Sequence, residues 1–138
     1  MRFLRHYLVL LAAAVHPAAA VEIQQYHTHD FAFKANVQGN PFDVELAGEF
    51  RGPGGADLKV PGFYDGDGVW KIRFSPTAVG RWSLRTISPV AELNGKAETN
   101  IDCTPNRHTN IHGSLRIDSR HPRHFIYEDG TRYFLNGL

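Results

Sequence analysis

The sequence is poor in cysteine, in net charge and in long apolar runs. Cys103 is the only cysteine, so an intramolecular disulfide is excluded and the thiol is interpreted as a small core group. Fifteen lysines and arginines are balanced by 14 aspartates and glutamates, which leaves no basic excess for binding a nucleic-acid backbone. With 138 residues, the chain is also too short for a complete (β/α)₈ barrel of roughly 250 residues. We therefore expect one ordinary globular domain and no nucleic-acid partner.

Common catalytic signatures are missing as well. The sequence contains no Gly-x-Ser-x-Gly elbow, no phosphate-binding loop and no His-Glu-x-x-His motif. Glu45 and Glu49 fall on one face of one expected strand, whereas glycoside hydrolysis needs two carboxyl groups that face each other across a cleft. We therefore expect no catalytic residue in this chain.

Two clusters of possible metal ligands are incomplete. Asp65 and Asp67 lie in a glycine-rich segment, but Val69 occupies the next ligand position of a calcium loop. His27 and His29 would share one face of a strand, but the sequence specifies no third zinc ligand. The sequence predicts no metal and no cofactor, with a weak calcium site as the alternative.

The first twenty residues have the order of a secretory signal peptide. Arg2 and Arg5 precede an apolar run at 7–15, and small residues at 18–20 offer a cleavage site. The run is shorter than the roughly 20 residues that a membrane-spanning helix needs. We expect cleavage near Ala20, a secreted or periplasmic bacterial protein, and no membrane partner after cleavage. A short N-terminal anchor is the alternative.

From Val21 onward, apolar residues alternate with polar ones, which is typical of strands with one buried face. In the clearest run, 42–50, a register shift of one residue would bury the three carboxylates of Asp43, Glu45 and Glu49. Strands are expected at 22–26, 31–37, 42–50, 57–60, 70–74, 81–86 and 96–103. The predicted core consists of apolar residues from these runs, namely Phe42, Val44, Leu46, Trp70, Ile72, Phe74, Trp82, Leu84 and Ile101.

Turn residues separate the expected strands. Asn40-Pro41, the glycine-rich stretches 52–55 and 65–68, and Asn94-Gly95 all lie between strand candidates. About seven short strands at this spacing predict an all-β, antiparallel β-sandwich of immunoglobulin or fibronectin type over residues 21–103. A small antiparallel barrel is the alternative.

The character of the sequence changes after Cys103. Residues 104–113 are polar and contain Pro105, so we interpret them as a linker. Residues 114–138 contain three further strand candidates and a tight hairpin signal at Asp129-Gly130. The last apolar run has no following element to cover it, so we expect the chain to be part of a longer protein.

Two groups of segments carry a recognisable pattern. The first consists of 41–46 (PFDVEL), 60–68 (VPGFYDGDG), 70–76 (WKIRFSP) and 80–83 (GRWS). In these segments the chain resembles the N-terminal β-sandwich domain, formally of unknown function, of bacterial secreted apiosidase-like glycoside hydrolases. The second group consists of 112–117 (HGSLRI), 121–125 (HPRHF) and 128–135 (EDGTRYFL), and it resembles the entry to the catalytic barrel of those enzymes.

The resemblance implies that residues 114–138 are the lead-in hairpin and first strand of a truncated (β/α)₈ barrel. It also implies that the catalytic carboxylates lie on later barrel strands. The predicted function is a non-catalytic accessory or scaffolding sandwich of a secreted polysaccharide-degrading enzyme. Its partners would be the intramolecular catalytic barrel and a plant or microbial polysaccharide.

Two other functions stay open. Trp70 and Trp82 alternate with charged residues and are assigned to the core, but Tyr64 is expected in a turn, where its ring could stack on a sugar. The first alternative is therefore a carbohydrate-binding module that uses turn aromatics, with Tyr64 as the candidate contact. The second is self-association through the apolar C-terminal segment.

Overall fold

The computed structural model describes residues 20–134, which form an all-β structure with two sheets and two single turns of 3₁₀ helix. The predicted signal peptide lies outside these residues apart from Ala20, and so do residues 135–138 of the predicted barrel strand. Signal cleavage and export therefore stay predictions. Within residues 20–134, no helix is long and apolar enough to cross a membrane.

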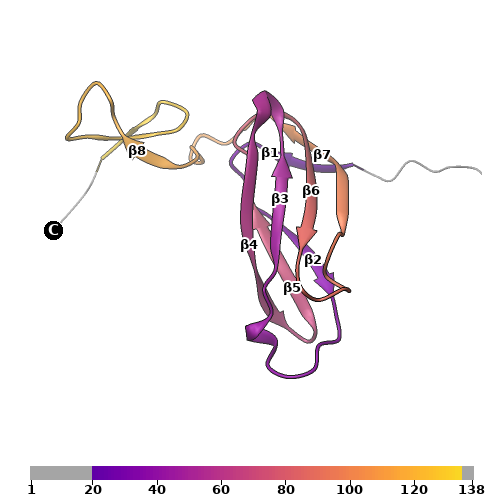
Figure 1. Cartoon of the computed structure of the whole chain (residues 1–138). Helices are drawn as coiled ribbons and strands as arrows, with labels where there is room; N and C mark the ends of the chain where they lie inside the picture. Colours follow the sequence, from indigo (N-terminus) through magenta and orange to yellow (C-terminus); the bar gives the residue numbers. More distant parts are fainter. Residues whose placement is uncertain (1–19, 135–138) are drawn as a thin grey trace, which may run out of the picture.

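Seven strands make one sheet with the order β1-β7-β6-β3-β4-β5-β2 (Figure 1). The strands are β1 (Val21–Gln24), β2 (His29–Lys34), β3 (Ala47–Arg51), β4 (Asp57–Gly66), β5 (Val69–Phe74), β6 (Gly80–Ile87) and β7 (Ala97–Thr104). All neighbours pair antiparallel except β1 and β7, which are parallel. This mixed sheet corrects the prediction of a wholly antiparallel arrangement.

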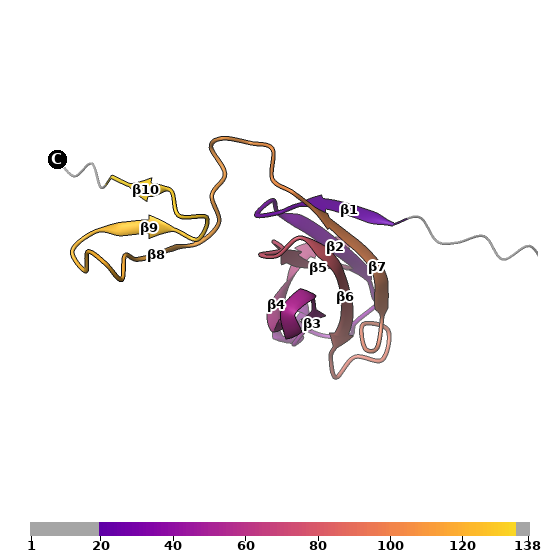
Figure 2. The ribbon, with the colours of Figure 1, turned by 90° about the horizontal axis from the view of Figure 1, so that it is seen from above.

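Strand β4 belongs to both layers of the fold. Its first half pairs with β3, from Asp57 to Pro61, and its second half pairs with β5, from Gly62 to Gly66. Seen along the strands, the continuous sheet curls around the core (Figure 2). The fold is therefore all-β and sandwich- or barrel-like, and the immunoglobulin-type assignment stays a prediction.

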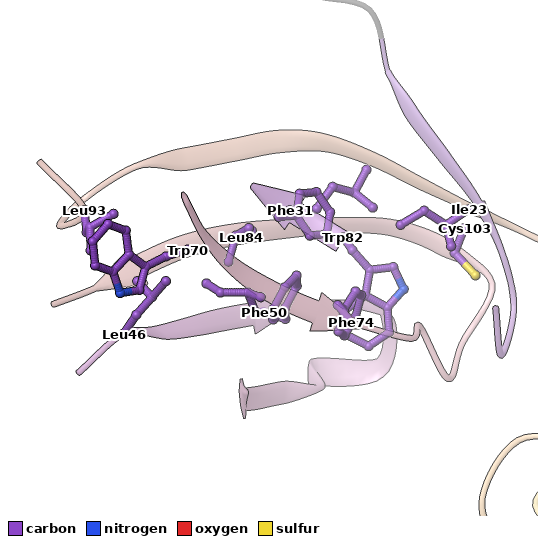
Figure 3. Packing of buried hydrophobic residues seen from close by; sticks show 12 residues of the cluster. Ile23, Phe31, Leu46, Phe50, Trp70, Phe74, Trp82, Leu84, Leu93 and Cys103 are labelled. Carbon is purple, nitrogen blue, oxygen red and sulfur yellow. The ribbon is translucent and has the colours of Figure 1, made fainter. Parts of the chain in front are cut away.

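The core between the layers combines five aromatic side chains with aliphatic ones (Figure 3). Phe50 stacks on Phe74 with 3.7 Å between ring centroids, and Phe74 meets Trp82 edge-on at 5.2 Å. The predicted core residues Leu46, Trp70, Ile72, Phe74, Trp82, Leu84 and Ile101 are buried, and Val44 is half-buried against them. Ile23, Phe31, Phe50, Leu93 and Cys103 complete the buried apolar set.

The prediction that a strand begins at Phe42 is wrong. Residues Pro41–Asp43 form a 3₁₀ turn, because the Asn40 side chain accepts a hydrogen bond from the Phe42 amide and proline occupies the first turn. The strand begins only at Ala47, and the Phe42 side chain is 76% exposed. Phe42 is therefore not a core residue.

The predicted alternation also fails in the first half of β7. Trp82 lies opposite Ile101, but Leu84 lies opposite Glu98, so β7 contains one extra residue between these pairs. As a result Ala97 is exposed, although the sequence pattern placed it on the same face as Ile101.

A separate three-stranded antiparallel sheet follows β7. It contains β8 (Leu115–Ile117), β9 (Phe125–Tyr127) and β10 (Arg132–Tyr133) in the order β10-β9-β8, and it lies to one side of the seven-stranded domain (Figure 1). The predicted hairpin at Asp129-Gly130 is confirmed: the Tyr127 amide donates to the Thr131 carbonyl at 2.8 Å, and Gly130 has a φ of 90°.

Candidate functional site

Tyr64 lies within strand β4 and not in the predicted turn. Its ring packs against Trp70 at 4.8 Å, and Phe42 meets it edge-on at 5.3 Å. The Tyr64 hydroxyl accepts a hydrogen bond from the Gly68 amide at 3.2 Å. Tyr64 is therefore half-buried and held in place, and Phe42 is the more exposed ring of this pair.

The outer face of β2, β4 and β5 carries paired charges. Arg73 donates two hydrogen bonds to the Asp30 carboxylate, at 2.7 and 2.8 Å. These bonds lower the pKa of Asp30 and raise the pKa of Arg73. Asp65 contacts the Lys71 ammonium at 2.5 Å. In the segment weighed as a calcium loop, this carboxylate therefore forms an ion pair with a side chain of the protein.

The two histidines weighed as zinc ligands do not converge. His27 packs against His108 with 4.7 Å between ring centroids, whereas His29 packs edge-on against Phe31. Over residues 20–134, no group of three His, Cys, Asp or Glu side chains is arranged to hold a metal ion. The only thiol, Cys103, is buried, and this burial raises its pKa.

The segment predicted as a linker is docked against the turn between β1 and β2. Tyr26 has a φ of 69°, and its ring packs so closely on Gly113 that a Cβ there would lie 2.7 Å from ring atoms. The amide of Arg107 donates to the Gln24 side chain at 3.3 Å. Burial and the carboxylate of Glu128 raise the pKa of Tyr26, so a charged group of the small sheet acts electrostatically on the turn between β1 and β2.

One face of the three-stranded sheet is apolar, and most of it is left exposed by the described residues, although the His112 ring packs on Tyr127 at 4.9 Å. Ile117 and Tyr133 both pair in register with Phe125, so the three side chains share one face. Ile117 is 63% exposed and Phe125 is 39% exposed. Tyr127 meets Tyr133 edge-on at 5.5 Å and extends the same surface. We call Leu115, Ile117, Phe125, Tyr127 and Tyr133 the aromatic face.

The loop between β8 and β9 is ordered by Asp118. Its carboxylate accepts a hydrogen bond from the Arg120 amide at 2.9 Å and contacts His121 Nδ1 at 3.0 Å, and these contacts lower the pKa of Asp118. A cavity of about 140 Å³ lies beside this loop, lined by Asp118, His121, His124 and side chains of β9 and β10. This cavity cannot be predicted from the sequence, because its lining combines residues of the loop with residues of two strands.

Comparison with known proteins found one family match and a similar solved structure. Residues 22–89 match DUF5060, a domain of unknown function. A solved structure from Bacteroides vulgatus ATCC 8482, described as a "putative glycoside hydrolase", is similar to the chain with a TM-score of 0.74 and 34% sequence identity. The match covers 83% of this chain and 21% of that protein. None of the curated proteins matches the chain.

The two matches together support a glycoside-hydrolase-associated domain of unknown function. The DUF5060 match ends just after β6. The structural match reaches further: residues 1–104 are about three quarters of the chain, so coverage of 83% includes residues beyond β7. The chain spans about a fifth of the Bacteroides protein, which therefore has a large part with no counterpart here.

Proposed function

We propose that this chain is a non-catalytic accessory domain that frames the catalytic barrel of a secreted polysaccharide-degrading glycoside hydrolase. The observation that carries the proposal is the aromatic face of the three-stranded sheet. Large apolar surfaces that are exposed in a soluble protein mark interaction sites. In our proposal the catalytic part of the enzyme covers this face, and the three-stranded sheet is the lead-in to its barrel.

The similarity to the Bacteroides protein supports this reading. It extends past β7 into the chain that follows, and about four fifths of that protein lie outside the match. The docked linker supports it as well, because the contact of Tyr26 with Gly113 attaches the chain just before the small sheet to the larger domain. A scaffold of this kind needs no reactive groups of its own.

The test uses this chain alone and a full-length glycoside hydrolase that contains it. We expect the chain to release no product from aryl glycosides and the full-length enzyme to be active. In the full-length enzyme, Phe125→Glu should lower the melting temperature, because a charge would be buried against the barrel. Phe42→Glu is the matched control, since Phe42 is 76% exposed and contacts Tyr64 of the seven-stranded domain and not the small sheet. Product release by the chain alone, or equal effects of the two substitutions, would contradict the proposal.

A carbohydrate-binding module is the second candidate, and the exposed Phe42 ring favours it. Phe42 and Tyr64 form an edge-to-face pair at the end of the seven-stranded domain, where a neutral sugar could stack. Calorimetric titration with neutral hemicellulosic oligosaccharides tests this function. Saturable heat that Phe42→Ala abolishes would support it, and absence of heat would leave the scaffold as the only one of the two.

A further inference from the structure

The face of the small sheet opposite the aromatic face carries arginine side chains. Arg116 on β8 and Arg132 on β10 both pair in register with Ile126 on β9. Residues that pair directly across neighbouring strands point to the same side of the sheet, so two guanidinium groups flank one apolar side chain. Since neighbouring strands are about 4.8 Å apart, the Cα atoms of the two arginines lie about 10 Å apart.

An ordered loop brings a third arginine to this face. Asp118 accepts the amide of Arg120, and the backbone of the loop closes further turns from Asp118 to His124. Arg116, Arg120 and Arg132 line one groove of about 420 Å³, together with Asp118 and Ile126. This volume lies within the range of about 300–1,000 Å³ that is typical of small-molecule sites.

The positive charge in this groove exceeds the negative charge. In the part of the chain that the structure describes, none of the three arginines has an ion pair. Residues 105–134 contain five arginines and three acidic residues, whereas residues 20–104 contain more acidic than basic residues. Two of the three acids, Asp118 and Asp129, contact histidines. The residues that line the groove therefore include three guanidinium groups and one carboxylate, Asp118, which leaves an excess of positive charge.

We propose that the arginine groove binds an acidic oligosaccharide through its uronate carboxylate groups. A guanidinium group holds a carboxylate with two parallel hydrogen bonds, and neighbouring acidic sugars along a glycan offer several such groups. Ile126 supplies an apolar surface between the arginines, and the Asp118 carboxylate can accept a bond from a sugar hydroxyl. The choice of a glycan over an acidic protein surface rests on the proposed function, and it names the substrate class that this function left open.

Calorimetric titration of this chain with a linear tetramer of galacturonic acid tests the proposal. We expect saturable binding, which Arg116→Gln and Arg132→Gln each weaken about tenfold because a bidentate contact is lost. Arg132→Lys should also weaken binding, since an ammonium group keeps the charge but not the paired geometry. Arg85→Gln is the matched control: this exposed arginine lies on β6, and its substitution should leave the affinity unchanged.

Three results would overturn the proposal: no saturable heat with the acidic tetramer, equal affinity for a neutral tetramer, or an equal loss in Arg85→Gln. Inorganic sulfate that competes as strongly as the tetramer would show an unselective anion site and would overturn it too. Each result is distinguishable from failure of the scaffold, which is measured on the stability and turnover of the full-length enzyme.

Discussion

Replacing each of the two buried tryptophans by phenylalanine should have clearly different effects on stability. Trp82 and Trp70 are equally buried, with exposed fractions of 0% and 1%. The Trp82 indole N–H donates to the Ala78 carbonyl at 2.8 Å, whereas the indole N–H of Trp70 has no hydrogen-bond partner among residues 20–134. The two substitutions remove the same ring volume but differ in what happens to the polar group.

The magnitude follows from this difference. Both variants leave a similar cavity, so that part of the cost cancels in the comparison. Trp82→Phe also loses a hydrogen bond worth about 1 kcal/mol, whereas Trp70→Phe removes a buried unpaired donor whose desolvation costs about 1–3 kcal/mol. Trp82→Phe should therefore be more destabilising by about 2–4 kcal/mol. For a domain of this size, that corresponds to a melting temperature lower by at least about 8 °C.

Thermal and urea unfolding of the purified variants, followed by circular dichroism, measures this difference. Coincident transitions by tryptophan fluorescence would confirm that two-state analysis is valid. Equal losses, or a larger loss for Trp70→Phe, would refute the reasoning that hydrogen bonding separates the two indoles.

Three further predictions concern the seven-stranded domain. Gly52→Ala should strongly destabilise the domain, because a Cβ at Gly52 would overlap the Trp82 indole. In a double-mutant cycle measured by urea unfolding, Trp82→Phe should relieve part of this loss. Strictly additive losses would contradict the contact. Arg73→Gln should return the pKa of Asp30 toward its ordinary value of 3.8, measurable by carboxyl NMR titration. Since pairing lowers the folded-state pKa of Asp30, the wild-type chain should be more stable than Arg73→Gln above pH 3.8. This difference in stability should vanish as the pH falls through the lowered pKa, and a pH-independent difference would contradict the reasoning. Phe42→Ala should cost about 1 kcal/mol or less in urea unfolding, and a loss typical of a core phenylalanine would contradict its exposed placement.

Sequence alternation located the centre of the fold because β5 and β6 follow it without interruption. Trp70, Ile72 and Phe74 point inward from β5, and Trp82 and Leu84 point inward from β6. Here local pattern and tertiary packing require the same facing, so the pattern alone is sufficient.

The alternating pattern predicted the wrong structure where local backbone hydrogen bonding or a proline and a glycine competed with it. Asn40 caps a 3₁₀ turn and thereby removes Phe42 from the strand that its spacing indicated. Pro61 and Gly62 interrupt the strand signal of β4, and this interruption places Tyr64 in a turn when the sequence is considered alone. In the structure the strand continues through both residues to Gly66. Such effects depend on which backbone groups are already paired, and spacing does not record that.

The arginine groove illustrates a further limit. Arg116 and Arg132 are distant in sequence, and only the register of three strands brings them to either side of Ile126. Their alternation with apolar neighbours was a usable signal, but pairing could not be inferred from it. The apolar character of the C-terminal strands was visible in the sequence, whereas the separation into an aromatic and a basic face required the structure.

Side-chain footprinting tests the central claim most directly. Hydroxyl radicals modify exposed aromatic rings, so their reaction with Phe125 and Tyr133 measures whether the aromatic face is covered. We predict that both residues react in this chain alone and become protected in a full-length glycoside hydrolase that contains it, while Phe42 reacts equally in both. Equal modification of Phe125 and Tyr133 in the two proteins would contradict a scaffold that packs on the catalytic part through this face.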